Sequence, residues 1–377
     1  MEKKFIPYGL HEIGEDDIEA VAEALRSDWI TGGPKIAEFE KAFCDYIGCK
    51  NTVAVCNGTA ALDIAVQSLG LPKDSEIITT PFTFVASSNA VLYNDCKPVF
   101  ADIEKEARNI DASSVRKKIT KKTRAILFVD YAGHPSNIKE LAELAEEHDL
   151  YLIEDACHAL GAEYGGRKVG NFADLSIFSF HPVKHITTGE GGAVATDDEE
   201  LHERMMLLRN HGIDRDAGKR AGKDSSYVYD MKMLGRNYRI TDFQCALGLS
   251  QLKKLPGFIQ RRRHLVGIYE SLLADADFLE VPKVAKDVRH SWHLYTVLLD
   301  ADRDRVFDHM RRMNIGVNVH YIPVYRHSFY RTNLRIDPKD YPVTEEVYKR
   351  IMTLPLYPRM EEGDVSRVCD ALKSFVK

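Results

Sequence analysis

The chain has 377 residues, of which 44% are hydrophobic and 29% are charged, and its formal net charge at pH 7 is −6. At roughly 100–200 residues per domain, this length predicts two domains, or one large α/β domain with a smaller appendage. The acidic balance argues against a nucleic-acid-binding protein, which normally carries a basic face. The longest apolar runs, such as 125–129, are far shorter than the ~20 residues that span a bilayer. Since the N-terminus also lacks the apolar core of a signal peptide, we expect a soluble, cytoplasmic protein.

The cysteines and histidines show no metal-binding or disulfide pattern. The seven cysteines are scattered, and none forms a Cys-x-x-Cys pair, so free thiols are expected rather than a disulfide framework or a zinc site. His181 and His185 have the spacing of two metal ligands on a helix, but Pro182 lies between them. No carboxylate completes the pattern, and we predict no metal site.

The first two thirds of the chain alternate between short β-branched runs and helical patterns. This alternation is typical of an α/β architecture with a mostly parallel sheet. Apolar residues at helical spacing predict a first helix over 14–27. The predicted strands then lie, in chain order, at 52–55, 76–79, 98–101, 125–130, 151–155, 175–180 and 192–196, with helices among them at 59–69, 87–93 and 138–148.

A change of pattern near Pro256 predicts a domain boundary. A helix is predicted from Thr241 to Leu255, where Pro256 and Gly257 would end it. We therefore divide the chain into a large domain, 1–255, and a small C-terminal domain, 256–377. The small domain is predicted to contain strands near 294–299 and 316–320 and helices at 303–313 and 344–351.

Two basic clusters, 116–122 and 261–263, fall on predicted helices. The first lies at a helix C-terminus, where cations suit the helix dipole. A nucleic-acid site would need a wider basic field than either cluster provides. We interpret both clusters as solvated helix surface.

Asp155 is the last residue of the predicted strand 151–155. A carboxylate at the end of a buried strand is costly unless it meets a cation or hydrogen-bond donors. Open α/β sheets bind their ligands at these strand ends, which makes Asp155 a candidate site residue. The structural alternatives are a helix cap and a salt bridge.

Lys184 lies between the predicted strand 175–180 and a glycine-rich turn at 187–192. Burial and a nearby cationic group can lower the pKa of an amine and make it a nucleophile towards carbonyl groups. The alternative is an ordinary solvated lysine in a loop. The glycines match neither common nucleotide-binding fingerprint.

Two further strand ends carry suggestive residues. Asn57, Gly58 and Thr59 open a helix after strand 52–55, where free amides and a hydroxyl can cradle a phosphate, although a simple N-cap is the alternative. Phe84 follows strand 76–79 and is either a core residue or a ring that stacks on a cofactor. A carboxylate, a lysine, a phosphate cradle and a flat aromatic at successive strand ends are the parts that hold pyridoxal phosphate (PLP).

Ordered motifs run almost from end to end of the chain. They are SDWITGGP (27–34), NGTAAL (57–62), TPFTF (80–84), EDACHA (154–159), FSFHPVK (178–184), GEGG (189–192), LGRNYR (234–239) and VHYIP (319–323). This set resembles the sugar aminotransferases of the DegT/DnrJ/EryC1/StrS type. The resemblance implies the fold of aspartate aminotransferase, a fold type I PLP enzyme, with a mostly parallel central sheet, helices on both faces and a smaller C-terminal α+β domain. Residues 1–255 would then bind PLP.

The resemblance assigns roles to individual residues. Lys184 would form the Schiff base with the cofactor, and Asp155 would hold its pyridinium nitrogen protonated. Family members that act as dehydratases have His in place of this lysine. The other implied cofactor contacts are Gly58, Thr59 and Ser179 at the phosphate, Phe84 against the ring, His158 beside the phenolic oxygen, and Asn237 at the phosphate of a neighbouring subunit.

Because Asn237 would reach the neighbouring subunit, the resemblance implies a homodimer with shared active sites. It also implies a set of contacts to a nucleotide-sugar substrate. These are Tyr8, Asp28, Trp29, Ile30, Thr31, Asn57, Ser179, Asn237, His320 and Tyr321.

The implied reaction is transfer of an amino group from an amino acid, by family habit glutamate, to C4 of a UDP-linked 4-keto-6-deoxy sugar. Lys184 would move the proton as general base and acid. Residues 157–164 and 178–184 most resemble the members that act in pseudaminic acid biosynthesis. Three alternatives stay open: another nucleotide-sugar 4-aminotransferase of the perosamine or bacillosamine-precursor type, a PLP-dependent sugar dehydratase, and a non-catalytic sensor.

Overall fold

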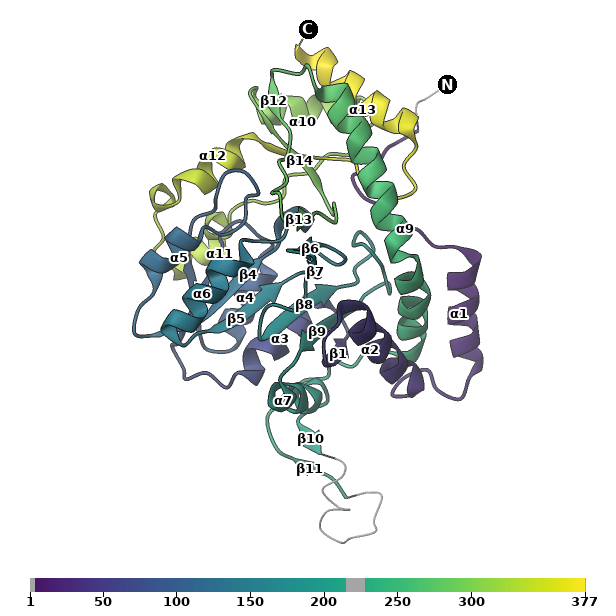
Figure 1. The fold of residues 1–377 in the computed structure, drawn as a ribbon, viewed down its shortest axis with the longest axis vertical. Coiled ribbons are helices and arrows are strands. Elements are labelled where there is room, and N and C mark those ends of the chain that lie inside the picture. Colours follow the sequence, from purple (N-terminus) through teal and green to yellow (C-terminus); the bar gives the residue numbers. More distant parts are fainter. Residues whose placement is uncertain (1–3, 215–227, 377) are drawn as a thin grey trace.

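A computed structural model describes residues 4–214 and 228–376 (Figure 1). Each strand predicted in the first two thirds of the chain is present, with its ends shifted by at most two residues. The strands are β1 (Asn51–Val55), β2 (Glu76–Thr79), β3 (Lys97–Phe100), β4 (Thr123–Val129), β5 (Tyr151–Asp155), β8 (Leu175–Ser179) and β9 (Gly192–Thr196). They form one seven-stranded sheet in the order β1-β9-β8-β5-β4-β2-β3. Only β9 runs antiparallel to its neighbours, so the predicted mostly parallel sheet is confirmed.

Helices cover both faces of this sheet, because successive side chains of a strand point to opposite faces. In β1, Val53 and Val55 pack on one face and Ala54 on the other. The first face is covered by α3 (Gly58–Ser68), α4 (Ala86–Tyr93) and α7 (Glu199–Arg209). The second is covered by α2 (Pro34–Ile47), α5 (Ala112–Lys118), α6 (Ile138–His148) and the first half of α9 (Asp242–Leu273).

Helix α9 passes through Pro256 without ending there, so the predicted end at Pro256-Gly257 was wrong. Its first half buries Leu255 against the large sheet, and its second half buries Leu265 and Tyr269 in another core. Burial at both ends stabilises one continuous helix at the cost of the backbone hydrogen bond that Pro256 cannot donate. Figure 1 shows α9 running alongside the sheet towards the C-terminal elements. Neither α9 nor any other helix of the described ranges has the length and apolar character needed to cross a bilayer.

The elements after α9 build the second core. A three-stranded antiparallel sheet has the order β12-β14-β15. The strand predicted at 316–320 is instead a segment with a single bridge, between Asn318 and Thr353. We keep the division near Pro256 as a proposal, with α9 shared by both parts. The elements are β12 (Leu279–Glu280), β14 (Tyr295–Leu299), α10 (Arg303–Arg312), α11 (Ser328–Asn333), α12 (Pro342–Arg350), β15 (Ile351–Leu354) and α13 (Glu362–Val376).

Short elements complete the fold. Helix α1 (Glu15–Arg26) packs along α9 (Figure 1). Two small sheets have the orders β13-β6-β7 and β10-β11. Their strands are β6 (Glu163–Tyr164), β7 (Arg167–Lys168), β10 (Ile213–Asp214), β11 (Asp230–Met231) and β13 (Val288–Arg289).

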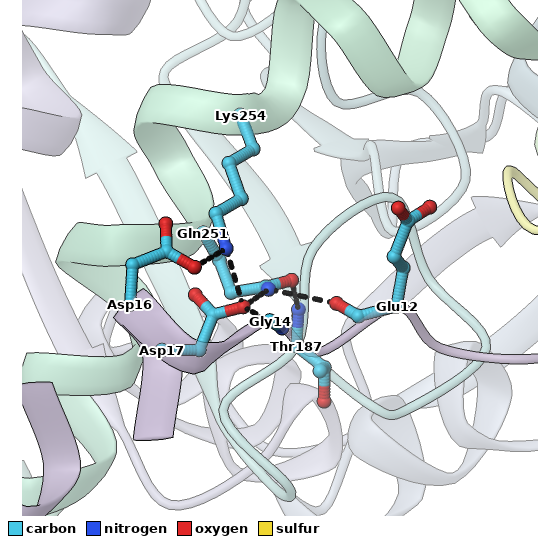
Figure 2. A network of polar contacts seen from close by, with 7 residues as sticks. All are labelled: Glu12, Gly14, Asp16, Asp17, Thr187, Gln251 and Lys254. Carbon is cyan, nitrogen blue, oxygen red and sulfur yellow. Dashed lines mark hydrogen bonds and ion pairs between the residues drawn. The ribbon is translucent and has the colours of Figure 1, made fainter. Parts of the chain in front are cut away.

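A polar network fastens α1 to α9 and to the loop after β8 (Figure 2). The buried Asp17 carboxylate accepts hydrogen bonds from Gln251 Nε2 at 2.8 Å and from Lys254 Nζ at 2.6 Å. Gln251 Oε1 in turn accepts from the backbone N–H of Thr187 at 3.4 Å. Since Thr187 follows Lys184 closely, this network helps to hold the loop that carries the candidate lysine.

The basic cluster 261–263 differs from its predicted state at one residue. Arg262 is 1% exposed and donates to the carbonyl oxygens of Trp292, His293 and Leu356 at 3.2, 3.3 and 2.9 Å. The prediction of solvated surface was therefore wrong for Arg262, because a guanidinium can satisfy several peptide carbonyls where chain segments meet. In the cluster 116–122 most side chains are exposed, as predicted.

Candidate active site

A cavity of about 1180 Å³ opens where β1, β5 and β8 end. Because these strands share one direction, the residues that follow them meet at one edge of the sheet. The structure therefore brings together the candidate residues from separate strand ends. Among the residues that line the cavity are Asn57, Gly58, Thr59, Phe84, Asp155, His158, Ser179 and Lys184.

Asp155 is 4% exposed and is the last residue of β5. Its Oδ2 accepts a hydrogen bond from Ser87 Oγ at 2.7 Å, and its Oδ1 accepts from the backbone N–H of Cys157 at 3.3 Å. These donors offset the cost of burying the carboxylate. Within the described residues Asp155 neither caps a helix nor forms a salt bridge, so neither structural alternative applies.

Lys184 lies in the turn between β8 and β9, where its backbone N–H donates to the carbonyl of His181 at 2.8 Å. Burial lowers the pKa of its amine, although the nearby Cys157 and Asp155 raise it in part. The net decrease raises the fraction of neutral amine, which is the nucleophilic form. Lys184 is therefore not an ordinary solvated loop lysine.

The start of α3 provides both an N-cap and an open cradle. Asn57 Oδ1 accepts from the backbone N–H of Ala60 at 2.8 Å, so the N-cap interpretation is confirmed. The first amides of a helix have no partner within the helix, and those of Gly58 and Thr59 belong to this turn. A Cβ on Gly58 would lie 3.0 Å from Ser179 Cβ. The missing side chain thus keeps open a space between α3 and Ser179 that suits a phosphate group.

A chain of hydrogen bonds orients His158 and Tyr321. The backbone N–H of Ala132 donates to His158 Nδ1 at 3.3 Å, and Tyr321 Oη lies 3.0 Å from His158 Nε2. Burial, aided by Lys184, lowers the pKa of His158 well below its usual value, so the ring is neutral. Since Nδ1 is the acceptor, the proton is on Nε2 and is donated to Tyr321 Oη. The hydroxyl proton of Tyr321 is then free to point into the cavity.

Aromatic and imidazole rings form much of the remaining wall. Phe84 is 57% exposed, which excludes a core role, and its ring centroid lies 6.2 Å from that of Tyr321. Tyr8 and His320 also line the cavity, with their ring centroids 5.4 Å apart. Burial and the nearby Lys184 lower the pKa of His320 to about 3, so this ring too is neutral.

Two predicted segments lie outside the cavity. Residues 28–31 and Asn237 are exposed and are not part of its lining. Residues 30 and 31 lie beside the start of α9, since Thr31 forms a β-bridge with Thr241 and the N–H of Asp242 donates to the carbonyl of Ile30 at 3.1 Å. Their predicted roles stay predictions.

Sequence reasoning missed several residues of the site. Ser87, which donates to Asp155, had one usable signal, since it is a hydroxyl at the start of a helix after a strand end. His293, whose ring centroid is 4.4 Å from that of His158, had none. It comes from the segment before β14, and only the packing of the second core against the sheet brings it here.

Behind the site, Asp130 and Glu154 form a buried carboxyl pair. Asp130 Oδ1 accepts from the backbone N–H of Ser136 at 2.7 Å, and Glu154 Oε2 accepts from Ser176 Oγ at 2.6 Å. The other oxygen of each carboxyl, Asp130 Oδ2 and Glu154 Oε1, is buried and has no hydrogen-bond partner among the described residues. Burial and the charge of Glu154 raise the pKa of Asp130 well above its usual value, so the folded state favours the protonated form of this carboxyl.

This pair predicts that stability falls as pH rises. The folded state keeps a proton that the unfolded chain releases above a pKa of about 3.9, so the stabilisation is complete below that pH and is lost as pH rises through the folded pKa. Asp130→Asn replaces the proton by a permanent N–H and should flatten the dependence, whereas Asp130→Ala should cost about 1–3 kcal/mol. Urea unfolding from pH 5 to 8 measures this, with the exposed Asp45→Asn as control. An unchanged slope in Asp130→Asn would contradict a protonated Asp130 in the folded state.

Comparison with known proteins bears on what this cavity does. The model of the DegT/DnrJ/EryC1/StrS aminotransferase family matches residues 11–373. The chain belongs to this family. The resemblance read from the motifs is thereby confirmed, as is the fold type I architecture, and the chain is a PLP-dependent sugar aminotransferase.

Three relatives illustrate the similarity. A Campylobacter jejuni protein named UDP-4-amino-4,6-dideoxy-N-acetyl-beta-L-altrosamine transaminase is 38% identical, over 99% of this chain and 98% of its own. The spore coat polysaccharide biosynthesis protein SpsC of Bacillus subtilis is 37% identical, over 99% of this chain and 97% of its own. The structure of Helicobacter pylori PseC, an aminotransferase of pseudaminic acid biosynthesis, superposes with a TM-score of 0.93 at 34% identity, covering 98% of this chain and 99% of that one.

Proposed function

We propose that this aminotransferase moves an amino group from L-glutamate to C4 of UDP-2-acetamido-2,6-dideoxy-β-L-arabino-hex-4-ulose, a step of pseudaminic acid biosynthesis in the cytoplasm. One observation carries the chemistry: a single cavity unites Lys184, Asp155 and the start of α3. The substrate is supported by the Campylobacter transaminase and by the structural match to PseC. The lysine at 184 favours transamination over dehydration.

The residues of the cavity suit PLP. Asp155 would face the ring nitrogen, Gly58, Thr59 and Ser179 would hold the phosphate, and Phe84 would lie against the ring. When bound, the cofactor supplies an electron sink for the charge left on the donor's α-carbon. The lowered pKa of Lys184 leaves more of its amine neutral. This amine would take the proton from the α-carbon of the donor and deliver it to the cofactor. The Tyr321 hydroxyl, which accepts a hydrogen bond from neutral His158, would donate one to an oxygen of the bound groups.

We also propose a homodimer in which each subunit completes the other's site. Asn237 and the segment 28–31 are both exposed and outside the lining of their own cavity, and Thr31 pairs with Thr241, which follows Asn237 closely in the chain. One surface of a subunit could therefore present both to a partner. A closed twofold dimer would make the two sites equivalent.

Mixing inactive variants tests the shared site. Lys184→Ala and Asn237→Ala proteins are each expected to be severely impaired. In a mixed dimer the pocket with native Lys184 receives native Asn237 from the other chain. After full exchange of equal amounts, activity should return to about a quarter of wild type, because half of the dimers are mixed and each has one intact pocket. No recovery after verified exchange would show that Asn237 does not act across subunits.

A substrate panel tests the reaction. The purified enzyme is given glutamate and a series of UDP- and dTDP-linked 4-keto sugars, and the product is analysed for the configuration at C4. The β-L-arabino substrate is expected to be turned over fastest. Preference for another 4-keto sugar would support the second candidate, a different nucleotide-sugar 4-aminotransferase. The 37% identity with SpsC is the observation that favours this candidate.

A further inference from the structure

Asp63 is a buried carboxylate of α3 that has no role in the chemistry described above. It is 1% exposed. Its Oδ1 accepts a hydrogen bond from Asn94 Nδ2 at 3.0 Å, and its Oδ2 accepts from Tyr238 Oη at 2.9 Å. Arg236 Nε lies 3.3 Å from the same Oδ2. A buried carboxylate that is held by a cation and two donors is a rigid anchor.

Two of these partners, Arg236 and Tyr238, are the residues on either side of Asn237. In an extended segment alternate side chains point the same way, so the two neighbours turn inward to Asp63 while Asn237 is exposed. The backbone is held as well: the N–H of Arg236 donates to the carbonyl of Leu208 at 2.7 Å, and the carbonyl of Tyr238 accepts from Cys56 N–H at 2.9 Å.

We propose that Asp63 is a positioning residue that aims Asn237 at the phosphate site of the partner subunit. The proposal rests on the shared active site proposed above. One carboxylate contacts both flanking side chains, as the acceptor of the Tyr238 hydroxyl and as the ion-pair partner of Arg236, while Asn237 between them is exposed. Without Asp63 the half-buried side chains of Arg236 and Tyr238 lose this shared partner, and Asn237 between them is held less firmly in one orientation.

A loss of activity in an Asp63 variant could also have a second cause, which the test must distinguish from the misplacement of Asn237. Asp63 is in the same helix as Gly58 and Thr59, so its loss could also disturb the cradle of its own chain. A defect of that kind stays with the chain that carries the substitution. A defect in aiming Asn237 appears instead in the pocket of the partner.

The experiment mixes Asp63→Ala with Lys184→Ala and measures activity and PLP affinity after subunit exchange. Alone, Asp63→Ala should bind PLP about tenfold more weakly or worse, the loss typical of a charge-assisted hydrogen bond. In the mixed dimer, the pocket with native Lys184 receives Asn237 from a chain whose Asp63 is intact, so activity and affinity in that pocket should recover. Asn94→Ala, which removes only the other partner of Asp63, is the matched control and should stay near wild type.

The outcomes separate this inference from the proposed function. If Lys184→Ala regains activity when mixed with Asn237→Ala but not when mixed with Asp63→Ala, the role of Asp63 is overturned and the shared site stands. Failure of both mixtures would overturn the shared site, and the inference with it. Should Asp63→Ala not fold, Asp63→Asn takes its place, because it keeps an acceptor for Tyr238 and loses the charge that faces Arg236. Wild-type affinity and activity in that variant would also contradict the proposal.

Discussion

Replacing Lys184 by Ala is expected to lower the rate of transamination by roughly 10³-fold or more, because general acid–base catalysis by itself is worth about 10²–10⁴-fold. Burial lowers the pKa of this amine, and Asp155 and Cys157 line the same cavity. Single-turnover assays with glutamate alone measure the loss in the donor half of the reaction. A rate within tenfold of wild type would contradict the assignment.

Two measurements show that this loss is chemical rather than structural. Lys184 is in a turn that lines the cavity, so its substitution should leave the melting temperature almost unchanged. Lys41→Ala, at an exposed salt bridge with Asp45, is the matched control and should keep full activity. Borohydride should fix the cofactor to Lys184 in the native enzyme, and peptide mass mapping identifies the residue. An adduct on another lysine would identify a different nucleophile.

Asp155→Asn should retain cofactor but lose activity by at least about 100-fold, since a neutral amide cannot hold a pyridine nitrogen protonated and the electron sink weakens. Steady-state rates measure the effect, and absorbance of the bound cofactor measures occupancy. Ser87→Ala is the matched control, because it removes the 2.7 Å donor to Asp155 without removing the charge. Its loss should be only several-fold, as for one hydrogen bond of about 1 kcal/mol. An Asn variant near the wild-type rate would make Asp155 a structural residue.

The sheet and its site could be read from local patterns. Short β-branched or apolar runs in β1, β4 and β5 mark strands, and the helices between them follow from spacing. Asp155 and Lys184 were predicted to meet because the ends of parallel strands share one edge of a sheet, and this requires only the strand positions and their direction. The structure places both in one cavity.

Other features depend on contacts between residues far apart in the chain, which no local pattern encodes. Pro256 predicted a break, yet burial against two cores keeps α9 continuous. Arg262 looked solvated, yet three carbonyls of other segments surround it.

The difference between short-range patterns and long-range contacts also decides which features of the site could be predicted. By itself, the sequence determined the α/β architecture and the residues at the strand ends, because both follow from short-range periodicity and the direction of strands. The tertiary structure alone decided that the rings of His293 and His158 lie together, that Asn237 is exposed outside the lining of its own cavity, and that Asp63 contacts Arg236 and Tyr238. Those relations arise when separate elements pack against one another, and packing depends on shape and burial across the whole fold.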